Sequence, residues 1–153
     1  MKVGELIPHP PITCHPHDTL ANAAQRMWEG DCGALPVVDE DGRLVGMITD
    51  RDICIALATH KHRSATHIAV REAMTRPVFN CFVDENLKIV LGTMATHRIR
   101  RLPVLDKIGH LQGVVSIDDI VLAPHRRGAP TPDEIVQAYR SICAKPTLEP
   151  AFA

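Results

Sequence analysis

Features typical of several large protein classes are missing from this chain of 153 residues. It has no apolar run long enough to span a bilayer, and aromatic side chains make up only 3% of the total. Its 17 basic and 18 acidic residues leave a net charge of −1, which gives no general attraction to nucleic acids or membranes. These absences argue against a membrane protein and against nucleic acid as a partner.

Signatures of secretion and catalysis are missing as well. The five cysteines include no C-x-x-C pair, so neither a zinc knuckle nor a disulfide framework is predicted. The N-terminus has no signal-peptide pattern, which predicts a cytoplasmic protein with reduced thiols. There is no glycine-rich phosphate loop, and Ser116 is not part of a nucleophile elbow. The sequence therefore predicts a protein that is not an enzyme and requires no cofactor.

Nine histidines raise the question of a metal site. Six of them form two groups, which are His9, His15 and His17 around Cys14, and His60, His62 and His67 in a polar stretch. Neither group matches H-E-x-x-H or zinc-finger spacing, so surface histidines are the favoured interpretation. A metal- or redox-responsive protein stays open as an alternative.

What the chain does contain is an internal repeat. The stretch Gly46-Met47-Ile48-Thr49-Asp50-Arg51-Asp52-Ile53 returns 67 residues later as Gly113-Val114-Val115-Ser116-Ile117-Asp118-Asp119-Ile120. Without gaps, residues 3–57 and 70–124 share 16 identities in 55 positions. A unit of this size is marginal alone, and two copies are too few for a solenoid. The repeat therefore predicts two similar units packed about a pseudo-twofold axis.

Each copy has the pattern strand, helix, β-hairpin, helix. In the first copy we expect a strand over 12–14, a helix over 19–29 capped by Asp18, hairpin strands over 34–38 and 43–48, and a helix from Thr49 to about residue 58. In the second copy we expect a strand over 80–83, a helix over 85–96 capped by Asp84, hairpin strands over 102–105 and 111–116, and a helix from residue 117 that stops before Pro124. Leu20, Ala23, Ala24 and Met27 form one predicted buried stripe.

A further helix is predicted over 131–146. Thr131 is a suitable N-cap, Pro132 suits the first helical position, and Glu134 completes a capping box. Ile135, Tyr139 and Ile142 share one face, which predicts that this helix covers a repeat surface or a subunit interface. The predicted domains are residues 1–60, a linker over 61–69, residues 70–124, and this helix.

The repeated pattern, with Leu-Pro-Val-x-Asp before the hairpin turn and Gly-x-x-[Ser/Thr]-x-x-Asp after it, resembles the cystathionine-β-synthase (CBS) domain. The resemblance covers residues 3–124, and the tandem pair is similar to a Bateman module. The whole layout is similar to stand-alone bacterial CBS-pair proteins of the hypoxic-response type. In residues 84–119 the second repeat also resembles a repeat of the nucleotide-sensing subunit of the AMP-activated kinase, through His97-Arg98, Arg101-Leu102, Ser116 and Asp119.

The resemblance implies an α+β fold in which two CBS repeats pack sheet to sheet, with the C-terminal amphipathic helix added. It also implies a regulatory, energy-sensing module that binds AMP, ADP or ATP between the repeats, forms a homodimer and acts on a downstream protein. A ligand-independent interaction or dimerisation module is the alternative from another class.

Thr49 with Asp52, and Ser116 with Asp119, are the predicted ligand residues at two helix starts. The aspartate carboxylates can accept hydrogen bonds from both ribose hydroxyls, and the hydroxyl side chains can donate to a phosphate. The same spacing also makes a capping box, which needs no ligand.

Basic residues are confined to one of the two helix–strand junctions. The resemblance makes His97 and Arg98 phosphate partners, whereas the first repeat has Gly30-Asp31-Cys32-Gly33-Ala34 at the matching positions. One charged phosphate region is therefore predicted, although cations also complement a helix C-terminus. Arg51 is a further candidate for a phosphate, with a solvated helix residue as the alternative.

An adenine would need a mostly apolar slot with backbone hydrogen bonds. The resemblance points to the first strands and to the Leu-Pro pairs, and the residues concerned are Thr13, Cys14, Leu35, Pro36, Asn80, Cys81, Phe82, Leu102 and Pro103. The apolar residues of this set are equally suited to the core. Cys14 and Cys81 are interpreted as buried thiols.

Overall fold

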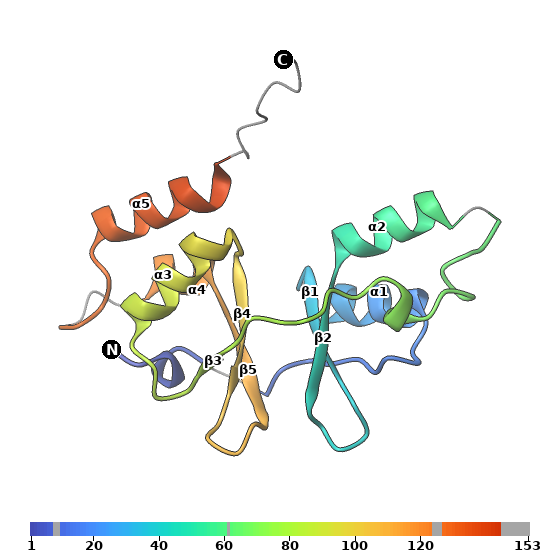
Figure 1. The fold of residues 1–153 in the computed structure, drawn as a ribbon, viewed down its shortest axis with the longest axis horizontal. Helices are drawn as coiled ribbons and strands as arrows, with labels where there is room; N and C mark the ends of the chain where they lie inside the picture. The colour runs from blue at the N-terminus through green and yellow to red at the C-terminus, as the bar shows by residue number, and fades with distance from the viewer. Residues whose placement is uncertain (8–9, 61, 124–126, 145–153) are drawn as a thin grey trace, which may run out of the picture.

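The computed structural model describes residues 1–7, 10–60, 62–123 and 127–144, and it has the predicted α+β architecture (Figure 1). The first unit contains α1 (Leu20–Glu29), β1 (Ala34–Val38), β2 (Leu44–Thr49) and α2 (Asp50–Thr59). The second contains β3 (Cys81–Phe82), α3 (Leu87–His97), β4 (Arg101–Leu105), β5 (Leu111–Ser116) and α4 (Ile117–Leu122). The helices lie on the outer side of each unit, so the two sheets face each other at the centre (Figure 1).

The two β-hairpins have the same register. Ala34 pairs with Thr49 in the first hairpin, and Arg101 pairs with Ser116 in the second. In both hairpins the pairing register shifts just before the last residue of the first strand. Each turn ends in a glycine with positive φ, which Gly42 and Gly109 adopt without strain because they lack a Cβ. Both predicted hairpins are therefore confirmed.

The strand that precedes each hairpin is shorter than predicted. Cys81 and Phe82 pair in parallel with β4, while in the first repeat only Cys14 forms a bridge, to Val37. In the second repeat the Val83 N–H extends the ladder by donating to Leu105 at 3.0 Å, whereas Pro16 at the equivalent position of the first repeat has no N–H to donate. A short edge strand is enough here because each unit gains its stability from the core behind the hairpin.

Two of the predicted helix caps are wrong by one or two residues. Thr19 caps α1 and Asn86 caps α3, each accepting a first-turn N–H with its side chain. Asp18 instead accepts from the His15 N–H, and Asp84 pairs with Lys107 at 3.4 Å. Several consecutive polar residues precede each helix, and only the one with extended backbone directly before the first turn can cap it.

The predicted stripe of α1 is correct except for Ala24. Leu20, Ala23 and Met27 are buried, but Ala24 is exposed in a groove between α1 and α2. Position 24 lies on the helix face next to the stripe, where burial depends on whether a second helix closes over it.

The segment that begins each repeat packs into the other repeat. Val3 is fully buried in the core of the second unit and Val70 in that of the first. The backbone bonds are exchanged in the same way, since Val3 N–H donates to Glu85 at 3.0 Å and Val70 N–H donates to Asp18 at 2.8 Å. The two cores are separate clusters, and the two units are tied together by their own N-terminal segments. Each of these segments contains a short helical turn, η1 (Val3–Glu5) in the first and η2 (Val70–Glu72) in the second.

The predicted C-terminal helix is α5 (Pro132–Cys143), which begins at the Thr131 cap with Pro132 and Glu134 in the expected places. It lies on α3 and α4 (Figure 1), where Ala138 and Ile142 enter the core of the second unit. Lys88 of α3 pairs with Glu134 at 2.8 Å. The expectation that this helix covers a repeat surface is thus confirmed. None of the described helices has the length and apolar content that a bilayer span needs.

Candidate functional site

Both predicted ligand motifs are capping boxes in the structure. The N–H and the hydroxyl of Thr49 donate to Asp52 Oδ2 at 2.9 and 2.8 Å. The Asp52 N–H in turn donates to the Thr49 hydroxyl oxygen at 3.1 Å. Ser116 and Asp119 repeat this arrangement, with 2.7 and 2.6 Å to Oδ2. All of these bonds use Oδ2, and within the described part of the chain Oδ1 of each aspartate accepts none. Capping and ligand binding are therefore compatible, because each aspartate keeps one oxygen for a ligand.

Asp119 lies at a cleft of about 350 Å³ between the repeats, which we call the Asp119 cleft. Its lining comes from three stretches, namely Ile7, Pro11 and Ile12 of the entry segment, Gly30, Cys32, Ala34 and Pro36 of the first unit, and Val114 and Asp119 of the second. The aspartate of one repeat therefore faces the helix–strand junction of the other. The sequence predicted Pro36 and Asp119, but it named Gly30 only as a junction position without a cation, and it did not assign Ile7, Pro11 or Ile12 of the entry segment to the site.

The 67-residue offset of the repeat relates the lining of this cleft to a set of positions around Asp52, which we call the Asp52 cleft. Ile12 and Gly30 correspond to Phe79 and His97, and these two rings stack with centroids 3.8 Å apart and 23° between their planes. In the Asp119 cleft a Cβ on Gly30 would overlap with the end of the Ile12 side chain, so a side chain at position 30 would require Ile12 to move. His97, predicted as a phosphate partner, is thus in contact with an aromatic ring.

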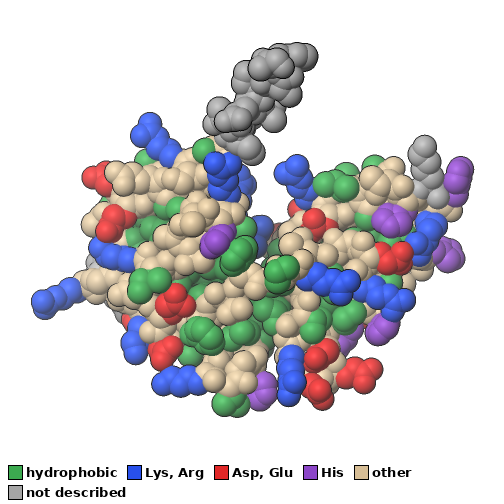
Figure 2. Space-filling view, in the orientation of Figure 1, with side chains coloured by type: hydrophobic (Ala, Val, Ile, Leu, Met, Phe, Trp, Pro, Cys, Tyr) green, Lys and Arg blue, Asp and Glu red, His purple; other side chains and the backbone are tan. Residues whose placement is uncertain are grey.

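The two clefts also differ in charge. Asp31 and Arg98 are equivalent residues with the same left-handed backbone, at φ 47° and 53°, but carry opposite charges. The second junction adds His97, Arg100 and Arg101, and the first has Gly30, Gly33 and Ala34 in their places. Figure 2 shows basic side chains on both rims of the hollow between the units, on the face that residues 73–80 cross in Figure 1. Arg101 pairs in the sheet with Ser116, the cap of α4, and its guanidinium lies near Gly33 of the first junction, so this cation stands beside both units.

The other predicted ligand residues lie in several environments. Leu35 and Leu102 are fully buried in the two cores, and Pro103 is also buried. Burial raises the pKa of the Cys14 and Cys81 thiols to about 12, with a smaller contribution from Asp18 and Glu85 respectively. Asn80, Phe82 and Arg51 are exposed, and Thr13 is half-buried. Their contact with a ligand stays a prediction.

A separate apolar groove of about 570 Å³ lies between α1 and α2. Met27, Ile53 and Leu57 line it, and Trp28 beside them is 86% exposed. On the second unit, α5 covers the corresponding helices α3 and α4. Among the described residues nothing covers the groove on the first unit. The sequence offered one signal for it, since the only tryptophan follows directly after a stripe residue.

Comparison with known proteins identifies the repeat. The model of the CBS domain matches residues 3–59 and again residues 70–126. Hypoxic response protein 1 of Mycobacterium tuberculosis is 36% identical over 145 residues, covering 90% of this chain and 91% of that protein. L-aspartate semialdehyde sulfurtransferase of Methanocaldococcus jannaschii is 36% identical over 118 residues, which are 77% of this chain but only 22% of that enzyme.

Solved structures give the same result. The CBS domain pair of protein MJ0100, in complex with 5′-methylthioadenosine and S-adenosyl-L-methionine, has a TM-score of 0.72 and 34% identity, covering 80% of this chain and 94% of that chain. Hypoxic Response Protein I with two coordinated zinc ions has a TM-score of 0.71 and 32% identity, covering 80% of this chain and 98% of that chain.

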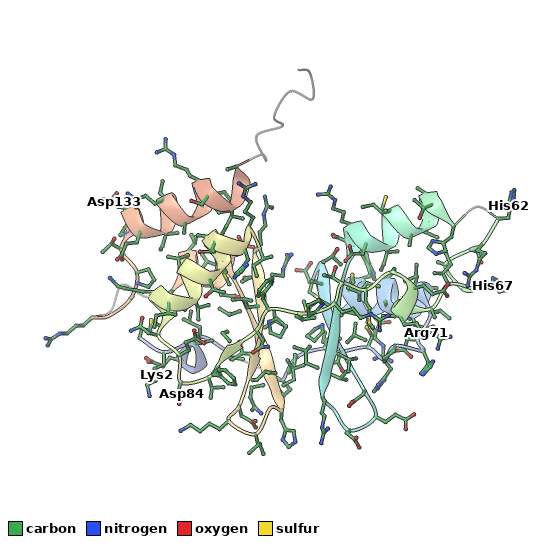
Figure 3. All side chains as sticks on the ribbon, viewed as in Figure 1. Lys2, His62, His67, Arg71, Asp84 and Asp133 are labelled. Carbon is green, nitrogen blue, oxygen red and sulfur yellow. The ribbon has the colours of Figure 1, made fainter. Side chains whose placement is uncertain are left out.

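The described residues do not fit a zinc site of that kind. In residues 1–7, 10–60, 62–123 and 127–144, no three His, Cys, Asp or Glu side chains come together around one point. His62 and His67 lie at the outer end of the first unit, away from the clefts (Figure 3). His15 and His60 contact backbone carbonyls through Nδ1. His9 lies outside the described residues.

Proposed function

The chain belongs to the CBS domain family, and we propose that its paired repeats bind an adenosine derivative in the Asp119 cleft and report this binding to a partner protein. The observation that carries the proposal is the cleft itself, which combines apolar walls with one carboxylate oxygen that no described residue uses. Small-molecule sites typically have this composition, with a few polar groups that fix the orientation of the ligand.

The chemistry of adenosine suits this cleft. Ile7, Ile12 and Pro36 offer an apolar slot for a planar base. Oδ1 of Asp119 can accept hydrogen bonds from the ribose hydroxyls while Oδ2 continues to hold the helix start. The solved CBS pair of MJ0100 with two adenosine compounds supports the same ligand class.

Binding would act on the relative arrangement of the two units. The entry segment is anchored in the second unit by Val3 and Ile7, and it lines the cleft with Ile7 on that side and with Ile12 beside Gly30 of the first unit. A ligand there contacts both units and their connecting segment at once. It shifts the arrangement only as far as it binds one form better than another. This is a regulatory role without catalysis, and an energy sensor would in addition have to distinguish AMP, ADP and ATP.

The test is calorimetric titration of adenosine into the wild type, Asp119→Asn and Asp52→Asn. Asparagine keeps the side-chain size and one cap acceptor, so both variants should fold. Loss of a charged hydrogen bond is worth about 1.5–3 kcal/mol, so Asp119→Asn should weaken binding by roughly 10- to 150-fold. Asp52→Asn should change it less than twofold, because Asp52 is not part of the lining of the Asp119 cleft. No binding to folded wild type would refute the proposal.

Assembly into a homodimer through the α1–α2 groove is part of the proposal. The exposed Trp28 and the apolar lining of the groove support it, as does the cover that α5 gives to the corresponding face. Trp28→Glu should convert the dimer to a monomer in sedimentation velocity, with Phe82→Glu as an exposed aromatic control outside the groove. If the dimer and partner binding form equally with and without adenosine, the ligand-independent interaction module becomes the better account.

A further inference from the structure

A second apolar groove, of about 470 Å³, lies between α4 and α5, and we call it the α4–α5 groove. Its apolar lining consists of Val121, Pro132, Ile135, Val136 and Tyr139. The charged lining residues are Arg140 and Asp118, of which Asp118 lies in the first turn of α4 and complements the helix dipole there. Val121, Val136 and Tyr139 are 53%, 55% and 42% exposed. Large apolar side chains exposed together are typical of an interaction surface.

Each unit therefore carries one apolar groove in its helical layer. The α1–α2 groove is on the first unit and the α4–α5 groove on the second, and in Figure 1 both α2 and α5 lie along the upper edge of the molecule. A buried aromatic side chain such as Trp28 contributes about 150–250 Å² to an interface. A stable interface needs about 800 Å² from each partner, so a second copy that docks on this edge has to use both grooves.

The second unit shows what the α1–α2 groove accepts. There α5 lies on α3 and α4, the helices that correspond to α1 and α2, and it places Ala138 and Ile142 in the core. The face that α5 turns away from that core still exposes Val136 and Tyr139. A helix with such a face suits the α1–α2 groove of another copy, because apolar ridges of one helix pack into the grooves of others.

The charges of the two grooves differ. The described lining of the α1–α2 groove includes Asp31 and Asp50, whereas the α4–α5 groove includes Arg140. Arg101 stands near Asp50, since a Cβ on Gly33 would lie 3.0 Å from the carboxylate and 3.8 Å from the guanidinium. Asp31 and Arg140 are exposed, and neither forms an ion pair within the part of the chain that the structure describes. These two charges are therefore available to a partner.

We propose that two copies of this chain pack head to tail, so that Trp28 of each enters the α4–α5 groove of the other and Asp31 of each faces Arg140 of the other. A twofold axis makes both contacts twice and closes the assembly as a dimer. Like grooves facing each other would instead bring Asp31 against Asp31 and Arg140 against Arg140, which repel. The proposal rests on the homodimer proposed above and specifies which surfaces meet.

Charge reversal at the proposed pair tests the orientation. Asp31→Arg and Arg140→Asp should each weaken the dimer about 5- to 30-fold in sedimentation velocity, because each places like charges together twice. The double variant restores opposite charges and should bind within about twofold of the wild type. Asp31→Arg suits the fold, since Arg98 has the same left-handed backbone at the equivalent position. Glu40→Arg, in the β1–β2 turn at the opposite edge of the molecule (Figure 1), is the control and should leave the dimer unchanged.

The apolar contact is tested through Trp28, the only tryptophan of the chain. Its fluorescence should shift to the blue in the dimer and back to the red on dilution, because the ring leaves water when the dimer forms. Val136→Glu should give red emission at concentrations at which the wild type is dimeric, although residue 136 belongs to the other unit. Ile89→Glu on α3, where Ile89 is 59% exposed, is the matched control and should keep the blue emission.

The outcomes separate the orientation from the homodimer that it rests on. A dimer that neither single charge reversal weakens, or in which the Trp28 emission stays red, would overturn the head-to-tail packing and leave the homodimer intact. Weakened single variants whose double variant does not recover would overturn the pairing of Asp31 with Arg140. A wild type that is monomeric at every concentration would overturn the homodimer, and the orientation with it. Circular dichroism and thermal unfolding would verify that all variants fold.

Discussion

The two repeats share many of their backbone hydrogen bonds but differ in the side chains of the junction that follows the first helix. Asp50 N–H donates to Gly33 as Ile117 N–H donates to Arg100, and Cys14 N–H donates to Pro36 beside a thiol that Cys81 repeats. The junction itself carries glycine and aspartate in one repeat and histidine and arginine in the other. The fold requires the shared bonds, whereas the junction side chains are free to specialise each cleft.

The comparison indicates a division of labour. The described lining of the Asp119 cleft contains no Lys, Arg or His, whereas the equivalent positions around Asp52 include the stacked rings of Phe79 and His97. An account based on the motif alone would treat Asp52 and Asp119 as equal ligand residues, since both make the same capping box. The structure makes them different because each cleft combines the aspartate of one repeat with the junction of the other.

The largest effect should come from making the first repeat resemble the second. The double variant Ile12→Phe with Gly30→His places the stacked rings in the Asp119 cleft, which should reduce binding of 5′-methylthioadenosine more than 100-fold in calorimetry. Ile12→Phe alone is the matched control and should cost less, because Gly30 still leaves space. Undiminished binding by a folded double variant would show that the ligand lies elsewhere.

The reverse exchange should create a second site. Phe79→Ile with His97→Gly removes the stack and leaves the lining that the Asp119 cleft has at these positions. The ligand-to-chain ratio in calorimetry should rise from one to two, with the second site weaker. Adding Asp52→Asn should return the ratio to one, and a ratio that never changes would mean that the stack does not close the cleft.

The exchanged starts of the repeats should contribute equally to stability. Val3→Ala and Val70→Ala each remove buried methyl groups from a core, at a cost of about 2 kcal/mol in free energy of unfolding. Urea unfolding followed by circular dichroism measures both. If Val70→Ala lowered the free energy of unfolding and Val3→Ala did not, the entry segment and the linker would not be structurally equivalent.

The smallest effect should come from the two buried thiols, Cys14 and Cys81, which should contribute equally to the loss of stability at high pH. The pKa of Cys14 and Cys81 is raised to about 12, so the folded chain holds protons that the unfolded chain releases above its thiol pKa of about 9. Stability from each thiol is complete below pH 9 and declines as the pH rises towards 12. At pH 10 each should cost about 1.4 kcal/mol, and Cys14→Ala or Cys81→Ala should each remove one thiol's contribution to the slope of stability against pH. If only one of the two substitutions changed this slope, the two thiols would not be equivalent.

The sequence was most informative where structure is local. Thr49, Ser116 and Thr131 start their helices as predicted, because a cap depends on a few neighbouring residues. The hairpins follow from alternation and turn residues in the same way. The caps at Asp18 and Asp84 failed because consecutive polar residues compete for one position.

Long-range features could not be predicted in this way. The burial of Val3 in the second unit depends on how the two repeats pack, and no local pattern encodes that. The role of Gly30 in the cleft was hidden because a glycine after a helix already has an explanation. The stack of Phe79 on His97 joins residues 18 positions apart that only the fold brings together. The alignment of the repeats sets Gly30 opposite His97 and Ile12 opposite Phe79, but it does not show that the two residues of each repeat are in contact.

The most direct test of the account is a crystal structure of the full chain with 5′-methylthioadenosine. The account predicts one ligand per chain, with its ribose hydroxyls at Asp119 Oδ1, its base against Ile12 and Pro36, and the Phe79–His97 stack undisturbed. A ligand bound at Asp52, or inserted between Phe79 and His97, would contradict it.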